Sequence, residues 1–288
     1  MPTIDEKRVY DDKTDTTRAL VASGVGVVAV SVSGDIVGEF GIEQQCSARD
    51  VAAHDGVLAV ATDEDVLVGD YAATDHGPAV AVGVHDGSVL AAAPDGTVSR
   101  LADTDDPSWE SLGTVMDPRA IDGDLIAAAD GVHRVVGDDL SAAGLDDVRD
   151  VTTRAIPHAA TADGLYSLGN GWQEDRDGSF RAVETDAVRT AGATNGECVA
   201  AATGDAVLTR EGPWGESGSE PPDGASGETG DDWQEHDESG VVALAIADDL
   251  LLGVTDGGVV RVTVGDGWRG RTLGVPEVSA VTILAGSE

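Results

Sequence analysis

An apolar run of alanine, valine and leucine recurs seven times along the chain, each time broken at a turn of small or acidic residues and resumed as a second run. The turns lie at residues 23–26, 63–65, 94–96, 130–131, 163–164, 203–205 and 256–257. Their spacing, from about 32 to about 53 residues, clusters below about 40, the range in which one repeat usually forms one blade of a β-propeller. The repeat therefore predicts an all-β fold, a single seven-bladed β-propeller.

Each repeat is long enough for four short strands. In the second repeat we expect an inner strand at residues 49–53, a second strand at 57–61 and a third at 66–68. Aspartate-glycine or asparagine-glycine pairs supply the positive φ that two-residue hairpins need, and they follow the inner strands at residues 54–56, 85–87, 121–123 and 194–196. The outer strand carries a tryptophan in four repeats, at Trp109, Trp172, Trp233 and Trp268. A degenerate Asp-box, the turn-plus-tryptophan signature of some propellers, looks similar.

The two ends of the chain predict how the ring closes. Residues 26–32 align with residues 258–264, so the chain begins with the second, third and fourth strands of a blade. Residues 278–284 form an inner strand with no second strand to follow. We therefore expect the C-terminal strand to complete the first blade and to leave no open edge at the seam.

The composition is strongly acidic. The formal net charge is −37, and Lys7 and Lys13 are the only lysines. This excess of acids, together with few aromatics and a core of small residues, resembles the proteins of halophilic archaea that accumulate salt. The acids are spread over every repeat, which favours a solvated surface over a nucleic-acid mimic or a cation trap. Because the Debye length falls to about 3 Å in molar salt, this charge says little about ligands.

One segment interrupts the repeat. Residues 211–232 are rich in proline, glycine, serine and glutamate, and their composition predicts a disordered acidic loop within one domain that spans residues 1–288. The loop is either a partner-binding segment or a tolerated surface insertion. The first residues contain no secretory signal, no apolar run approaches the roughly 18 residues of a membrane span, and two distant cysteines, Cys46 and Cys198, form no disulfide framework. These features predict a cytoplasmic protein.

Familiar catalytic and cofactor motifs are not matched. Residues 24–29 fit a dinucleotide fingerprint, but a strand and a turn follow them where that motif needs a helix. His54 and His85 recur at the same place in the inner hairpins, which indicates a role in the repeat rather than in catalysis or metal binding. The scattered aspartates lack the spacing of a calcium loop. We therefore predict no cofactor, no metal site and no catalytic residue, and we favour a protein that is not an enzyme.

Arginines provide the candidate binding residues. Arg49 and Arg149 each precede an aspartate and a valine where an inner strand begins, Arg189 lies in nearly the same place, and Arg119 is close by in its own repeat. Because inner strands line the central channel, these four arginines are expected near one mouth of the ring. Guanidinium groups there are suited to bidentate binding of a carboxylate or a phosphate. The alternative is that each arginine pairs with an aspartate of a neighbouring blade.

The sequence also resembles a known family. The residues that carry the resemblance are 6–11, 19–23, 32–35 and 48–52. They are similar to a haloarchaeal family of β-propeller proteins known only by locus tag, and the resemblance extends over the whole chain. It implies a cytosolic propeller in a halophilic archaeon, and it assigns no activity and no site residues.

Three functions remain open at this point. The first is a non-enzymatic scaffold that binds a protein partner through one propeller face. The second is a small-molecule site, for binding or hydrolysis of an anionic ligand, at the channel mouth near the arginines. The third is association with RNA or the ribosome, which requires a concentrated basic face that the sequence does not display. We expect a protein partner, allow a small anion, and expect neither nucleic acid nor a membrane.

Overall fold

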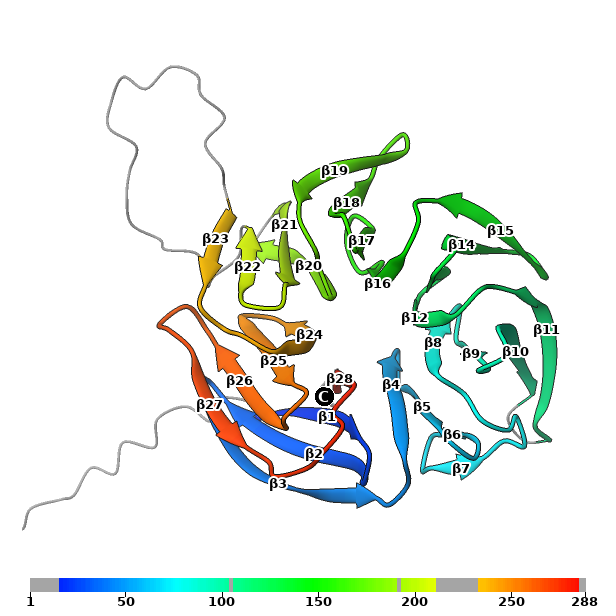
Figure 1. Ribbon diagram of the computed structural model, residues 1–288. Coiled ribbons are helices and arrows are strands. Elements are labelled where there is room, and N and C mark those ends of the chain that lie inside the picture. Colours follow the sequence, from blue (N-terminus) through cyan, green and yellow to red (C-terminus); the bar gives the residue numbers. More distant parts are fainter. Residues whose placement is uncertain (1–15, 104–105, 191–192, 211–232, 285–288) are drawn as a thin grey trace, which may run out of the picture.

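The computed structural model describes residues 16–103, 106–190, 193–210 and 233–284. These residues form seven four-stranded antiparallel sheets, which Figure 1 shows arranged around a central axis. The protein is therefore an all-β, seven-bladed β-propeller, as the repeat predicts. The acidic loop predicted at residues 211–232, together with Lys7 and Lys13, lies outside the described residues. No helix long and apolar enough to cross a membrane occurs in the described ranges.

We number the blades from the N-terminus and give the strands from the innermost outward. Blade 1 contains β28 (Ala280–Leu284), β1 (Thr17–Ser23), β2 (Gly26–Ser33) and β3 (Ile36–Gln44). Blade 2 contains β4 (Ala48–His54), β5 (Val57–Thr62), β6 (Val66–Val68) and β7 (Ala72–Ala73). Blade 3 contains β8 (Ala81–His85), β9 (Ser88–Ala92), β10 (Thr97–Asp103) and β11 (Ser108–Thr114). Blade 4 contains β12 (Pro118–Asp122), β13 (Leu125–Ala128), β14 (Gly131–Val136) and β15 (Asp139–Gly144).

The remaining blades follow the same order. Blade 5 contains β16 (Val148–Thr152), β17 (His158–Thr161), β18 (Gly164–Leu168) and β19 (Trp172–Asp177). Blade 6 contains β20 (Ala182–Thr190), β21 (Ala193–Ala202), β22 (Val207–Arg210) and β23 (Trp233–His236). Blade 7 contains β24 (Val241–Ala247), β25 (Leu250–Thr255), β26 (Val259–Thr263) and β27 (Arg269–Thr272). The hairpin predicted at residues 194–196 is wrong, because those residues lie inside β21.

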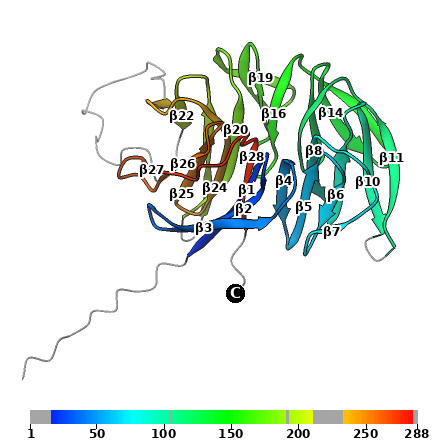
Figure 2. The ribbon, with the colours of Figure 1, turned by 60° about the horizontal axis from the view of Figure 1, so that its bottom comes forward.

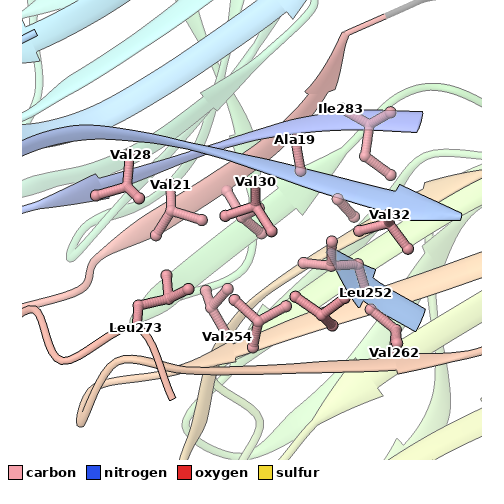
Figure 3. Packing of buried hydrophobic residues seen from close by; sticks show 14 of the residues in the cluster. Ala19, Val21, Val28, Val30, Val32, Leu252, Val254, Val262, Leu273 and Ile283 are labelled. Carbon is pink, nitrogen blue, oxygen red and sulfur yellow. The ribbon is translucent and has the colours of Figure 1, made fainter. Parts of the chain in front are cut away.

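The ring closes as the two chain ends predict. Strand β28 pairs antiparallel with β1, from Arg18 opposite Leu284 to Ala22 opposite Ala280. The seam with blade 7 is filled by small apolar side chains, and Figure 3 shows Val21 and Val30 of blade 1 facing Val254 of blade 7. Each inner strand also contacts the next, through β28, β4, β8, β12, β16, β20, β24 and back to β28. The apolar seam and the β28–β1 ladder thus hold the two chain ends together.

Small residues suit these strands because neighbouring blades cover both faces of a sheet. The described core is built from alanine, valine and leucine, and Phe180 is its largest fully buried side chain. Figure 2, a tilted view, shows the blades stacked side by side around the ring. The packing is close enough to require glycine in some turns. At Gly96, where φ is +93°, an added Cβ would lie 2.1 Å from the carbonyl oxygen of Val115.

The outer tryptophans join neighbouring blades. The indole of Trp109 in β11 donates a hydrogen bond to the carbonyl of Thr74 in blade 2, at 3.2 Å. The indole of Trp172 in β19 donates to the carbonyl of Ala143 in blade 4, at 2.8 Å. The segment that Trp109 contacts is itself fixed by Asp65 of blade 2. The Asp65 carboxylate accepts five backbone N–H groups, four of them from residues 74–77. A tryptophan on an outer strand is therefore a contact between blades.

Candidate ligand site at the central channel

The inner strands surround a central cavity of about 250 Å³. In every blade the loop from the preceding outer strand leads into the inner strand, so all seven inner strands begin at the same end of the channel. The turns between second and third strands lie on this face too, and backbone hydrogen bonds tie them to those loops, as from Gly24 to Pro276 and from Gly240 to Gly204. Four of the arginines that line the cavity lie on this face, whereas Arg154, which also lines it, lies in the loop between β16 and β17 on the opposite face.

Three of the four arginines predicted from the sequence line the cavity together. Arg49, Arg119 and Arg149 are each the second residue of an inner strand, β4, β12 and β16. Each also lies at a shift in the pairing with the next strand, a β-bulge. A bulge leaves one residue without a partner and redirects its side chain. The repeated bulge thus places the three arginines at one end of the channel.

Arg189 is not placed with them. It is the penultimate residue of β20, paired with Thr194 near the far end of that strand, and its side chain is outside the described part of the chain. Arg181, which directly precedes β20, lines the cavity instead. The end of the channel that carries Arg49, Arg119, Arg149 and Arg181 is called the arginine mouth below.

Two arginines of the mouth are paired with carboxylates. Arg49 forms a bidentate ion pair with Asp63 of its own blade, in which Nη2 lies 3.0 Å from Oδ2. Arg119 donates from Nη1 to Asp147 at the start of the next blade, at 2.6 Å, and also contacts Asp117. Only Arg119 therefore pairs with a neighbouring blade in the manner of the alternative interpretation.

Arg149 and Arg181 have different surroundings. Arg149 donates from Nη1 to two neutral acceptors of the loop before β20, the hydroxyl of Ser179 at 2.8 Å and the carbonyl of Phe180 at 3.1 Å. The guanidinium of Arg181 lies beside Gly204, where an added Cβ would be 3.5 Å from Nη2. Within the described residues neither guanidinium forms an ion pair with a carboxylate. Both guanidinium groups therefore lie at the mouth without a directly paired carboxylate among these residues.

Carboxylates lie next to the arginines and clamp neighbouring inner strands together. Asp50 accepts the N–H of Val51 in its own strand and that of Val82 in the next blade, at 2.8 and 2.9 Å. Asp150 repeats this arrangement with Val151 and Val183, both at 2.9 Å. Each aspartate thus supplies an acceptor where the bulge has interrupted the regular ladder.

Two further carboxylates face the same cavity. Asp122 accepts the N–H and the hydroxyl of Thr153, at 2.6 and 2.8 Å, and so joins blades 4 and 5. Glu184 accepts from Thr185 and from Thr152, both at 3.0 Å, and so joins blades 5 and 6. All four carboxylates of the channel wall therefore serve the contact between inner strands.

Burial shifts the pKa of three of these acids, Asp50, Asp150 and Glu184. It raises the pKa of Asp50 to about 6 and, with the charge of Glu184 nearby, that of Asp150 to about 8. It also raises the pKa of Glu184 to about 7, although Arg154 opposes the shift. Desolvation disfavours the charged form of a carboxyl group. Near neutral pH the channel wall therefore carries less negative charge than its composition suggests.

The sequence contained a signal for these acids. In Arg49-Asp50-Val51 and Arg149-Asp150-Val151 the arginine and the aspartate recur together. The sequence prediction used the two arginines and did not assign a role to the two aspartates. Arg181 is harder to find, because blade 6 has no bulge at the start of its inner strand. The register between β20 and β21 is needed to show that Arg181, and not Arg189, lies at the mouth.

A second polar group outside the channel resembles a catalytic set only in composition. His158 is fully buried and lies 3.2 Å from Asp175, while Ser167 donates to the other oxygen of that carboxylate at 2.9 Å. In a Ser-His-Asp triad the hydroxyl donates to the imidazole, whereas here it donates to the acid. Arg210 of blade 6 also bonds Asp175, at 3.2 Å. This network joins blades 5 and 6. No group of three metal-ligating side chains occurs among the described residues.

The fold and the channel define a seven-bladed β-propeller with a polar central cavity. The chain belongs to the HVO_0234-like β-propeller family, whose family model matches residues 3–284. This membership agrees with the family resemblance seen in the sequence. No curated protein matches the chain in sequence.

Solved structures show the same fold at low identity. The computationally designed Ika8 protein is 15% identical with a TM-score of 0.53, over 93% of this chain and 90% of that one. The WD40 β-propeller domain of Doa1 is 12% identical with a TM-score of 0.53, over 79% and 83%. The extracellular domain of the two-component system BT4673 from B. thetaiotaomicron is 10% identical with a TM-score of 0.55, but this chain covers only 38% of it. These likenesses show the fold alone.

Proposed function

We propose that the protein is a non-enzymatic interaction scaffold, in the cytoplasm of a halophilic archaeon, that binds a protein partner through the face of the ring carrying the arginine mouth. The observation that carries the proposal is that four arginines gather on this face in a chain of net charge −37, two of them without a carboxylate partner among the described residues. Propellers commonly present such a face to other proteins, and this part of the argument is an analogy of fold.

Other features of the same face support the proposal. Met116, in the loop before β12, is 64% exposed, and an exposed large apolar side chain suits a protein contact. Leu145 and Asp147, in the loop before β16, have φ values of +58° and +47°. A bulky residue rarely adopts this conformation without a structural or functional reason. The face thus combines charge, exposed apolar surface and a constrained loop.

The test is affinity purification of the tagged protein from cells lysed in molar salt. Met116→Asp places a charge in the proposed interface, and Ile156→Asp is the matched control, because Ile156 is 50% exposed in the loop between β16 and β17 on the opposite face. We expect the wild type and Ile156→Asp to retain a stoichiometric protein that Met116→Asp loses. The proposal is wrong if no stoichiometric protein is recovered, if only nucleic acid is recovered, or if Ile156→Asp is the variant that loses it.

A further inference from the structure

Hydrogen bonding divides the four arginines of the mouth into two kinds. Asp63 neutralises Arg49, while Asp117 and Asp147 neutralise Arg119. Arg149 bonds only a hydroxyl and a carbonyl among the described residues, and Arg181 has no side-chain hydrogen bond there. In a protein with 54 acidic residues, two cavity-lining guanidinium groups have no carboxylate partner among the residues that the structure describes. Their positive charge is available to a ligand.

The geometry of Arg149 leaves a binding edge open. Both of its hydrogen bonds start from Nη1, so the edge formed by Nε and Nη2 has no acceptor among the described residues. That edge presents two parallel N–H donors, the arrangement that binds a carboxylate or a phosphate in bidentate fashion. The side chain is also fixed, because Ser179 and Phe180 hold the third nitrogen. A fixed donor pair loses less conformational entropy when a ligand binds.

Arg181 lines the same cavity as Arg149. The two acceptors of Arg149 are the residues that immediately precede Arg181, so one short loop positions both cations. Both residues line the central cavity, whose volume of about 250 Å³ suits a small organic ion rather than a folded segment. One loop therefore brings both arginines to the lining of the same cavity.

Two observations favour an anion over a cation beside these two arginines. Asp150 and Glu184, the nearest carboxylates on β16 and β20, already accept hydrogen bonds from backbone or hydroxyl donors. Burial also raises the pKa of both groups, to about 8 and about 7, which reduces the negative charge below the arginines. An anion at the mouth is thus repelled less than a count of acids suggests.

We propose that Arg149 and Arg181 form an oxyanion site at the arginine mouth, which takes the carboxylate or phosphate group of a small molecule. The Nε and Nη2 atoms of Arg149 bind two oxygens of the group, and Arg181 closes over it from the side of blade 6. The site is independent of the scaffold function, since it requires no protein partner.

The test is isothermal titration calorimetry on the purified full chain in molar potassium chloride, with inorganic phosphate and with succinate as separate probes. We expect at least one probe to bind, and the tighter one identifies the chemical class. Arg149→Gln and Arg181→Gln should each weaken that probe about tenfold or more, because each removes charge-assisted hydrogen bonds. Arg149→Lys should weaken it similarly, because lysine keeps the charge and lacks the donor pair.

Arg100→Gln is the matched control. It removes the same charge from β10, where Arg100 bonds Asp138 and the carbonyl of Gly137 at a distance from the channel lining. We expect its affinity to stay within about twofold of the wild type. Circular dichroism and the thermal midpoint establish that each variant is folded. The proposal is overturned if neither probe binds the wild type, or if Arg149→Gln and Arg100→Gln have the same effect.

Discussion

Two glycines of blade 3 allow the close packing of the turns to be tested directly. Gly87 lies in the turn between β8 and β9 with φ of +76°, and Gly96 lies in the turn between β9 and β10 with φ of +93°. An added Cβ meets nothing within 4 Å at Gly87, but at Gly96 it lies 2.1 Å from the carbonyl oxygen of Val115. Substitution by alanine therefore imposes similar backbone strain at both sites and a steric clash at only one.

The structure gives the expected difference. A left-handed conformation costs an alanine about 1–2 kcal/mol at either position. At Gly96 the backbone of Val115 must also move, which costs about 1–3 kcal/mol by analogy with overpacked cores. The same movement disrupts the hydrogen bond from the Val115 N–H to the Gly96 carbonyl, 2.9 Å long, at a further cost of about 0.5–1.5 kcal/mol. We expect Gly96→Ala to lose about 2.5–6.5 kcal/mol and Gly87→Ala about 1–2 kcal/mol.

The assay is guanidinium denaturation at constant molar potassium chloride, with the free energy of unfolding taken by linear extrapolation. The denaturant slope must be the same for both variants if the comparison is to report stability. Equal losses for the two variants would refute the reasoning, because they would mean that the contact with Val115 has no energetic consequence.

Three further predictions concern the closure of the ring, the charge of Asp150 and the hydrogen-bond acceptor Asp65. Ile283→Ala, in the seam between blades 1 and 7, should lower the free energy of unfolding by about 2–5 kcal/mol, while Ile42→Ala, at an exposed position, should lower it very little. Equal effects would contradict the claim that apolar packing of the seam stabilises the closed ring. The unfolding free energy should fall as pH rises from 5 to 8, because folding raises the pKa of Asp150 from 3.8 to about 8 and the folded state then binds more protons. Asp150→Asn should make the unfolding free energy depend less steeply on pH. An unchanged pH dependence would mean that other groups cause it. Asp65→Ala should cost at least about 3 kcal/mol, since five N–H groups lose their acceptor, and a loss below about 1 kcal/mol would contradict this.

Much of the fold could be predicted because it depends on local repetition. The apolar runs and their turns recur in every blade. The alignment of the two chain ends predicts that β28 completes blade 1. The hairpin of blade 6 was misplaced because Asn195-Gly196, a strong turn signal, lies inside β21. Pairing of β21 with β20 on both sides of this dipeptide, at Thr194 and at Glu197, outweighs that local preference.

The candidate site was harder to predict, for a physical reason. Arg49, Arg119 and Arg149 were found because each shares its position in the repeat. Their pairing partners come from loops of variable sequence, so only the structure distinguishes Arg149, which contacts Ser179 and Phe180, from the neutralised arginines. Arg181 was missed because its blade lacks the bulge that moves the other arginines one residue into the strand.

The most direct test of the arginine mouth as the binding surface is a crystal structure of the full chain soaked in inorganic phosphate. The account predicts a phosphate at the opening between Arg149 and Arg181, with two of its oxygens on the Nε and Nη2 edge of Arg149. A phosphate bound only at the opposite end of the channel, or an empty mouth at saturating phosphate, would contradict it.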